Sequence, residues 1–189
     1  MQRLTSVDDV FELLESGGGE AYFGEPVTVL EHSLQAAWFV HRGGGESTLI
    51  AAALLHDLGH LLHSEGEDAT RRGLDTQHEE LAAAALGDHL PASVLDPIRL
   101  HVAAKRYLCY AEPGYMSALS PASQQSLALQ GGPMNDEQAA AFLRNPYANA
   151  AIALRRWDDE AKVVGLHVPN AAYYLPMLRT AAAEKQTGK

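Results

Sequence analysis

LIAAALLHDLGHLL, from Leu49 to Leu62, is the stretch that decides the fold. Alanine and leucine dominate it, as in a helix buried on most sides, yet His56, Asp57 and His60 interrupt it. In one continuous helix the two histidines would share a face, with the aspartate one step round from His56. Burying these groups without partners costs several kcal/mol. A cation that accepts the imidazole lone pairs and balances the carboxylate explains the trio best, with a hydrogen-bonded structural cluster as the alternative.

The alanine and leucine pattern recurs along the chain, whereas alternating stretches of valine, isoleucine and threonine are nearly absent. This pattern predicts an all-α protein. Glycine triplets and prolines punctuate the expected helix boundaries. We expect helices at residues 6–16, 26–42, 46–63, 77–89, 92–110, 121–130, 135–144, 147–163 and 170–185, with irregular segments at 64–76 and 111–120.

Composition limits the classes of partner. The 189 residues carry 24 acidic and 14 basic side chains, a formal charge of −10, and 47% are hydrophobic. We expect one domain over residues 1–189, with a core at about 22–165 and with the N-terminal helix and the C-terminal helix and tail peripheral. An acidic chain without a basic run predicts no nucleic acid and no membrane partner, and no protein partner is inferable. A single cysteine, Cys109, and no signal-peptide pattern predict a cytoplasmic location.

Further histidines and one aspartate form an ordered pattern around the pair His56 and Asp57. Each of them has an ordinary explanation on its own, as a cap, a surface group or a hydrogen-bonded core residue. In chain order they spell H…HD…H…H…D, at His32, His56, Asp57, His78, His101 and Asp158. This order resembles that of the HD-domain superfamily, helical bundles that are mostly metal-dependent phosphohydrolases.

The resemblance implies an HD-domain helical bundle with two metal sites that share one carboxylate. The first site would be held by His32, His56, Asp57 and Asp158. The second would be held by Asp57, His78 and His101, so that Asp57 bridges the ions. Histidine and carboxylate ligands with open positions suit iron or manganese, and iron permits redox chemistry.

A closer resemblance extends over almost the whole chain. Its segments are YFGE at residues 22–25, LEHSLQ at 30–35, AALLHDLGH at 52–60, HVAAKRYL at 101–108, QGGPM at 130–134 and RRWD at 155–158. They resemble the HD-domain mixed-valent diiron oxygenases, which are related to myo-inositol oxygenase. The nearest members cleave the carbon–phosphorus bond of 1-hydroxy-2-aminoethylphosphonates. The implied cofactors are two iron ions, Fe(II) and Fe(III), with O2 as co-substrate.

This second resemblance implies a small phosphonate substrate that chelates one iron and loses its C1 hydrogen, yielding phosphate and a glycine-type carboxylate. Two irons carry more positive charge than two aspartates offset, so the centre attracts an anion despite the acidic chain. Lys105, four residues after a ligand, and Arg155, three before one, would bind the phosphonate. Ser123 and Gln130 match family positions that line the phosphonate pocket.

Three further residues are expected near the metals. His60 lies outside the family's ligand set, and we expect it to hydrogen-bond oxygen or substrate. Tyr22 and Glu25 lie on a loop before the first ligand helix, where they would close over an open metal position. For Glu25, a plain role in the first helical turn before Pro26 is nearly as well supported.

The nitrogen end of the substrate separates two candidate compounds. A primary ammonium needs hydrogen-bond acceptors, whereas a trimethylammonium is held by aromatic faces and a carboxylate. Aromatic residues are available at Tyr22, Phe23, Tyr107 and Tyr110, with Glu25 nearby. We therefore favour 1-hydroxy-2-(trimethylamino)ethylphosphonate, which gives glycine betaine, over 1-hydroxy-2-aminoethylphosphonate, which gives glycine.

A second class of enzyme stays open at this point. A binuclear metal-dependent HD phosphohydrolase acting on a nucleotide or phosphomonoester would use the same ligands and bind a similar anion. A degenerate HD module that only senses a ligand is disfavoured because every ligand position is filled.

Overall fold

The computed structural model describes residues 4, 6–19, 22, 24–62 and 72–187 of the chain. This part contains helices and no β-strand element, which confirms the expected all-α class. The helices are α1 (Val7–Gly17), α2 (Val29–Arg42), α3 (Ser47–Leu55), the 3-10 turn η1 (Leu58–Leu61), α4 (His78–Leu86), α5 (Ala92–Ala111), α6 (Tyr115–Ala118), α7 (Pro121–Leu129), α8 (Asp136–Leu143), α9 (Ala148–Glu160) and α10 (Ala171–Thr187). Within the described residues, no helix is long and apolar enough to cross a membrane.

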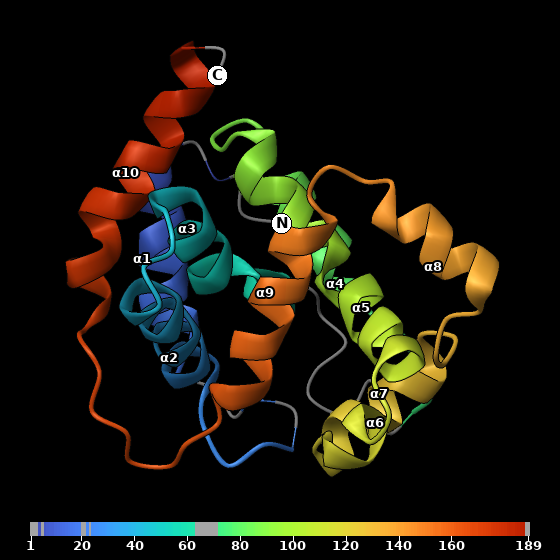
Figure 1. The fold of residues 1–189 in the computed structure, drawn as a ribbon. Coiled ribbons are helices and arrows are strands. Elements are labelled where there is room, and N and C mark those ends of the chain that lie inside the picture. The colour runs from blue at the N-terminus through green and yellow to red at the C-terminus, as the bar shows by residue number, and fades with distance from the viewer. Residues whose placement is uncertain (1–3, 5, 20–21, 23, 63–71, 188–189) are drawn as a thin grey trace.

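Helix α3 lies at the centre of the bundle and packs against α2, α5, α9 and α10 (Figure 1). All but two of its nine residues are buried, because alanines at 51–53 let neighbouring helices approach closely and leucines fill the remaining space. The two terminal helices, expected at the periphery, supply buried side chains to the same cluster, among them Leu14 of α1 and Tyr174 of α10. A second, smaller cluster joins α5, α8 and α9 around Phe142.

The start of α2 illustrates how local sequence sets the position of a functional residue. The Thr28 side chain accepts a hydrogen bond from the backbone N–H of Glu31, whose carboxylate accepts one from the N–H of Thr28. This reciprocal cap fixes the first turn of the helix. His32 therefore lies one turn inside α2, on the face that is fully buried.

The expected single helix over residues 46–63 is wrong. Helix α3 ends at Leu55, and η1 continues the chain from Leu58 in a tighter turn. His56 and Asp57 occupy the break between them, with Asp57 at φ −102° and ψ 10°, outside helical geometry. His56 keeps helical backbone angles, φ −59° and ψ −33°, so it is Asp57 whose direction is set by the break.

Close packing of η1 against α4 accounts for this break. A Cβ atom added at Gly59 would lie 1.9 Å from the backbone oxygen of His78, so only glycine fits there. The segment at 111–120, expected to be irregular, contains the short helix α6 in the structure.

Gly59→Ala tests the importance of this contact. The added methyl group forces α4 away from η1, so we expect a loss of about 1–3 kcal/mol of stability, together with weaker metal binding at His78. Thermal unfolding and metal analysis measure the two effects. Gly19→Ala is the matched control, because a Cβ there meets nothing within 4 Å. Equal stability of the two variants would contradict the packing argument.

Candidate active site

The structure brings together all six residues of the H…HD…H…H…D pattern, although they come from five separate parts of the fold. Each of the six is buried, with at most 8% of its surface exposed. They are His32 on α2, His56 and Asp57 at the break after α3, His78 at the start of α4, His101 on α5 and Asp158 on α9. Burial of so many ionisable groups requires strong compensation.

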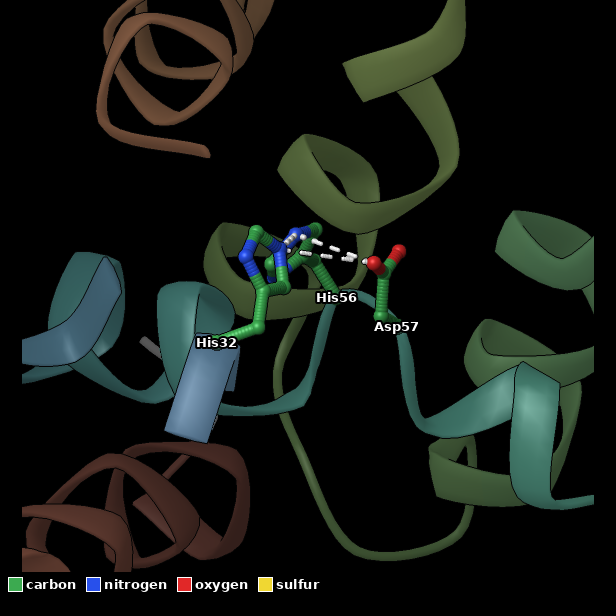
Figure 2. Close-up of side chains that lie close together, drawn as sticks. All are labelled: His32, His56 and Asp57. Atoms are coloured by element: carbon green, nitrogen blue, oxygen red, sulfur yellow. Dashed lines mark hydrogen bonds and ion pairs between the residues drawn. The ribbon is translucent and has the colours of Figure 1, made fainter. Parts of the chain in front are cut away.

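One group of donor atoms gathers around a single oxygen of Asp57. The Nε2 atoms of His32 and His56 lie 3.1 Å apart, and each is 3.5 Å from Asp57 Oδ2. Figure 2 shows the two imidazoles and the carboxylate turned toward one another. Asp158 Oδ1 completes the group at 3.4 Å from His32 Nε2.

A second group gathers around the other oxygen of the same carboxylate. The Nε2 atoms of His78 and His101 are 3.1 Å apart, and they lie 3.4 and 3.6 Å from Asp57 Oδ1. Each triad of donors fits within 4.8 Å. Asp57 thus presents one oxygen to each group, which is the arrangement of a carboxylate that bridges two ions.

Hydrogen bonds on the outer side of the rings decide which nitrogen is free. The Nδ1 atoms of His32, His56 and His101 each contact a backbone carbonyl, at 2.8, 2.9 and 2.7 Å. A carbonyl only accepts, so each Nδ1 carries a proton and donates, and each ring, when neutral, keeps its lone pair on Nε2.

These lone pairs show that the site fits metal ions. Two lone pairs 3.1 Å apart repel each other unless a cation lies between them. Ligand atoms at right angles on one ion, with bonds of about 2.1 Å, lie about 3 Å apart, as these do. Asp158 Oδ1, buried and without a hydrogen-bond partner in the described part of the chain, faces the same point.

The pKa values of the site agree with this interpretation. Burial lowers the pKa of His32 and of His101 to about 4, so both imidazoles are neutral ligands at neutral pH. Burial opposes charge on Asp57 too, but the surrounding imidazoles hold its pKa well below the usual range. At His56 burial is outweighed by the Asp57 and Asp158 carboxylates, which raise its pKa to about 9. The carboxylates therefore demand positive charge at the point where an ion would bind.

A pocket opens beside the two groups of ligands. Its lining includes every further residue that the sequence singled out for the site: Tyr22, Glu25, His60, Lys105, Ser123, Gln130 and Arg155. Tyr22 stacks on His32, with ring centres 4.2 Å apart, and donates a hydrogen bond to Asp57 Oδ2 at 2.5 Å. The ring of His60 stacks on that of His78 at 4.1 Å.

A row of serines on α7 faces the charged groups of this pocket. Ser120, Ser123 and Ser126 recur at every third residue, so they lie along one side of the helix. Ser120 donates to Glu25, Ser123 accepts from Lys162 at 3.1 Å, and Ser126 accepts from Lys105 at 2.9 Å. The pocket therefore has a carboxylate toward one end of the row and the Lys105 ammonium toward the other.

Arg155 lies in the pocket wall, but carboxylates already surround its guanidinium. Its Nη1 is 2.6 Å from Asp158 Oδ2, and its Nη2 pairs with Asp159. The hydroxyl of Tyr115 contacts both Arg155 and Asp159. This network fixes Asp158 so that its second oxygen points at His32.

The aromatic residues expected around a trimethylammonium are mostly elsewhere. Tyr107 packs against Phe142, with ring centres 5.2 Å apart, and Tyr110 is exposed and donates to Asp136. Neither residue lines the pocket, and Phe23 lies outside the described residues. Tyr22 is the only member of the expected set that the structure places at the pocket.

Sequence reasoning missed several residues at this site. Lys162 follows Asp158 by four positions, the same spacing that singled out Lys105 after His101, so this signal was present. The serine spacing on α7 was a second usable signal. Nothing in the sequence pattern pointed to Tyr115, because α6 was expected to be irregular.

Comparison with known proteins identifies the family. The model of the HD domain matches residues 29–137, more than half of the chain. The chain belongs to the HD-domain family. This HD protein is 45% identical over 174 residues to the hydroxymethylphosphonate dioxygenase of Gimesia maris, covering 92% of this chain and 85% of the relative.

Two other relatives match as much of the chain. The 1-hydroxy-2-(trimethylamino)ethylphosphonate dioxygenase (glycine-betaine-forming) of Leisingera caerulea is 39% identical over 179 residues, 95% of this chain and 91% of the relative. An uncharacterised protein of Acanthamoeba polyphaga mimivirus is 33% identical over 175 residues, 92% of this chain and 80% of the relative. These matches confirm the resemblance to the HD-domain oxygenases.

Metal content tests the proposed sharing of Asp57. Among the described residues, Asp57 is the only carboxylate that faces both groups of ligands, so we expect Asp57→Ala to lose both ions. His78→Ala or His101→Ala empties mainly one site, since the first group stays intact. Metal per chain is measured by elemental analysis, with His167→Ala, an exposed histidine, as the control. Two ions per chain in Asp57→Ala would show that the ligand assignment is wrong.

Proposed function

We propose that this HD protein is a non-heme diiron oxygenase that uses O2 to cleave the carbon–phosphorus bond of a small 1-hydroxyphosphonate. The observation that carries the proposal is the carboxylate of Asp57 presented to two groups of histidines beside a pocket lined by lysines and hydroxyls. Two relatives named as phosphonate dioxygenases support it. A reducing cytoplasm is part of the proposal, because one iron must stay as Fe(II).

The atoms of this reaction balance without an added reductant. A 1-hydroxyphosphonate and one O2 give a carboxylate, phosphate and a proton. The C1–hydrogen and C1–phosphorus bonds break, and both atoms of O2 end in the products. Hydroxymethylphosphonate would give formate, and the amino or trimethylamino compound would give glycine or glycine betaine.

The metal ligands fit two irons, with His32, His56 and Asp158 at one, His78 and His101 at the other and Asp57 between them. When bound, the irons would supply a chelating site for the hydroxyl and phosphonate oxygens and would activate O2. Over the whole reaction, the electrons that reduce O2 come from the C1–hydrogen and C1–phosphorus bonds of the substrate. Nitrogen and carboxylate ligands of this kind suit iron. His32 and His101 are neutral and bind it without losing a proton, whereas His56, with its pKa raised to about 9, releases one when the metal binds.

The residues of the pocket bind and orient the substrate. Lys105 donates to a phosphonate oxygen, with hydroxyls of Ser123 and Ser126 and the Gln130 amide beside it; Gln130 Oε1 is buried and has no hydrogen-bond partner in the described part of the chain. Arg155 contributes mainly by holding Asp158 in place.

Groups beside the reacting carbon complete the proposal. His60, stacked on His78, is placed to hydrogen-bond the substrate hydroxyl. Tyr22 covers the centre through its bond to Asp57, and this bond must loosen for the substrate to approach. Glu25 lines the same pocket, with its carboxylate bound by Ser120 and Lys162.

Oxygen dependence decides between the two classes of enzyme. With the iron-loaded protein and hydroxymethylphosphonate or its aminoethyl and trimethylaminoethyl counterparts, we expect one O2 consumed per phosphate released. An oxygen electrode and a phosphate assay measure this ratio. Hydrolysis of a nucleotide or phosphomonoester without O2, and no reaction with any hydroxyphosphonate, would favour the binuclear phosphohydrolase.

Replacement of Lys105 tests its role in binding. An ammonium that contacts a desolvated oxyanion contributes on the order of 1.5–3 kcal/mol, so Lys105→Ala should raise KM by about tenfold to a hundredfold. Iron content should not change, since Lys105 is not a ligand. An unchanged KM would eliminate this role.

The pH dependence of the reaction gives an independent test of Lys105. Burial lowers the pKa of its ammonium to about 7, so the positive charge is present below that pH and is lost above it. We therefore expect kcat/KM, which reports the free enzyme, to fall as the pH rises through 7. Lys105→Arg keeps its positive charge over this pH range. Dividing the kcat/KM of the unmodified protein by that of Lys105→Arg at each pH removes the effect of substrate ionisation, which is the same for both. A ratio independent of pH would contradict this assignment.

A further inference from the structure

The backbone around Lys162 is clamped to α2 on both sides. The Ala161 carbonyl accepts a hydrogen bond from His32 Nδ1 at 2.8 Å. The side chain of Gln35, which is buried, makes two bonds of 2.9 Å to Val163, one to its N–H and one to its carbonyl. These contacts hold the segment just after α9, so that Lys162 lines the pocket.

The ammonium of Lys162 forms an ion pair with Glu25. Lys162 Nζ is 3.0 Å from Glu25 Oε1 and 3.1 Å from Ser123 Oγ, and it lies 6.0 Å from the centre of the Tyr22 ring. The two charged side chains are only 12% and 8% exposed. Ser120 donates to the same carboxylate oxygen. The pair is therefore shielded from solvent. Separating a buried charge from its partner costs much more free energy than separating the same charges in water.

This pair removes the charge that a cationic substrate would need. Among the described residues that line the pocket, Asp57 and Asp158 belong to the metal ligands and Glu25 is bound by Lys162. Asp75, the remaining acidic residue of the lining, is exposed and accepts a bond from the backbone of Gln77. A charge in contact with water interacts weakly with a ligand deeper in the pocket.

The order of groups along α7 relates the pair to the substrate. Lys105 meets Ser126, whereas Glu25 meets Ser120, six residues earlier, or about 9 Å along the helix axis. The proposed function places the phosphonate at Lys105, and a substituent on C1 that follows the row of serines would reach Glu25 and Lys162. A cationic nitrogen there would meet the positive charge of Lys162 unless the ion pair opened.

We propose that Lys162 determines substrate choice by neutralising Glu25, so that this HD protein prefers 1-hydroxyphosphonates without a cationic nitrogen, of which hydroxymethylphosphonate is the simplest. This inference rests on the proposed function. It differs from the preference for a trimethylammonium that the sequence favoured, which depended partly on Tyr107 and Tyr110, two residues that do not line the pocket.

The test compares three substrates: hydroxymethylphosphonate and its aminoethyl and trimethylaminoethyl counterparts. We measure kcat/KM in air, and dissociation constants by calorimetry of the iron-loaded protein without O2, where no turnover occurs. The unmodified protein should prefer hydroxymethylphosphonate by tenfold or more in both measurements. An equal or greater preference for either nitrogen compound would overturn the proposal.

Variants of the ion pair isolate the cause. Lys162→Met removes the charge and keeps the length, and it should shift the ratio of affinities at least tenfold toward the nitrogen compounds. Lys162→Arg should retain the original ratio. Adding Glu25→Gln to Lys162→Met should cancel the shift, because no carboxylate then remains for the nitrogen. Lys162→Gln provides the same loss of charge if Lys162→Met does not fold.

Two failures are distinguishable. A ratio unchanged in folded Lys162→Met or Lys162→Gln protein that retains its iron would overturn the role of Lys162 alone. Absence of phosphate release from all three compounds in air would overturn the proposed function, while the calorimetric ratios would still test whether the ion pair selects among anions.

Discussion

The structure depends on one buried carboxylate, Asp57, whose two oxygens each face a pair of imidazole nitrogens. Backbone carbonyls fix the outer nitrogens of three of these rings, so their Nε2 atoms converge whether or not an ion is present. Such convergence is unfavourable in an empty cavity and becomes favourable around cations. The bundle must therefore be stable enough elsewhere to hold the ligands in place, and the apolar α3 and its neighbours provide that stability.

The sequence predicted the helical class and the family, and it singled out six residues that the structure brings together, because these depend on residue type and order. It did not predict the break after Leu55, because helix propensity is local, whereas the break depends on contact between Gly59 and the His78 backbone far along the chain. The backbone on the other side of that contact is strained. Gln77, just before His78, has a left-handed φ of 48°, which residues other than glycine rarely adopt. Packing between distant segments thus sets the direction of the ligands that the sequence identified.

The polar network around the ligands was harder to predict for the same reason. Arg155 was expected to bind the substrate, since its position three residues before Asp158 indicated a shared helix face. The structure shows that it lies at the pocket but is held between Asp158 and Asp159, with Tyr115 of α6 closing the network. Helical spacing shows which way a side chain points, but it does not show which partner from another helix reaches that side chain first.

Local charge, not the net charge of −10, governs what this pocket admits. The lysines and the arginine of its lining are distributed unequally: Arg155 is balanced by two carboxylates and Lys162 by Glu25, whereas the Lys105 ammonium contacts a neutral serine. A dianionic phosphonate is therefore directed to Lys105 and the metal side of the pocket. The opposite end, at Glu25 and Lys162, is close to neutral. It discriminates against substrates with a cationic nitrogen through the free energy needed to open a desolvated ion pair. Burial makes that energy large enough to matter, because the same pair at the surface would contribute little.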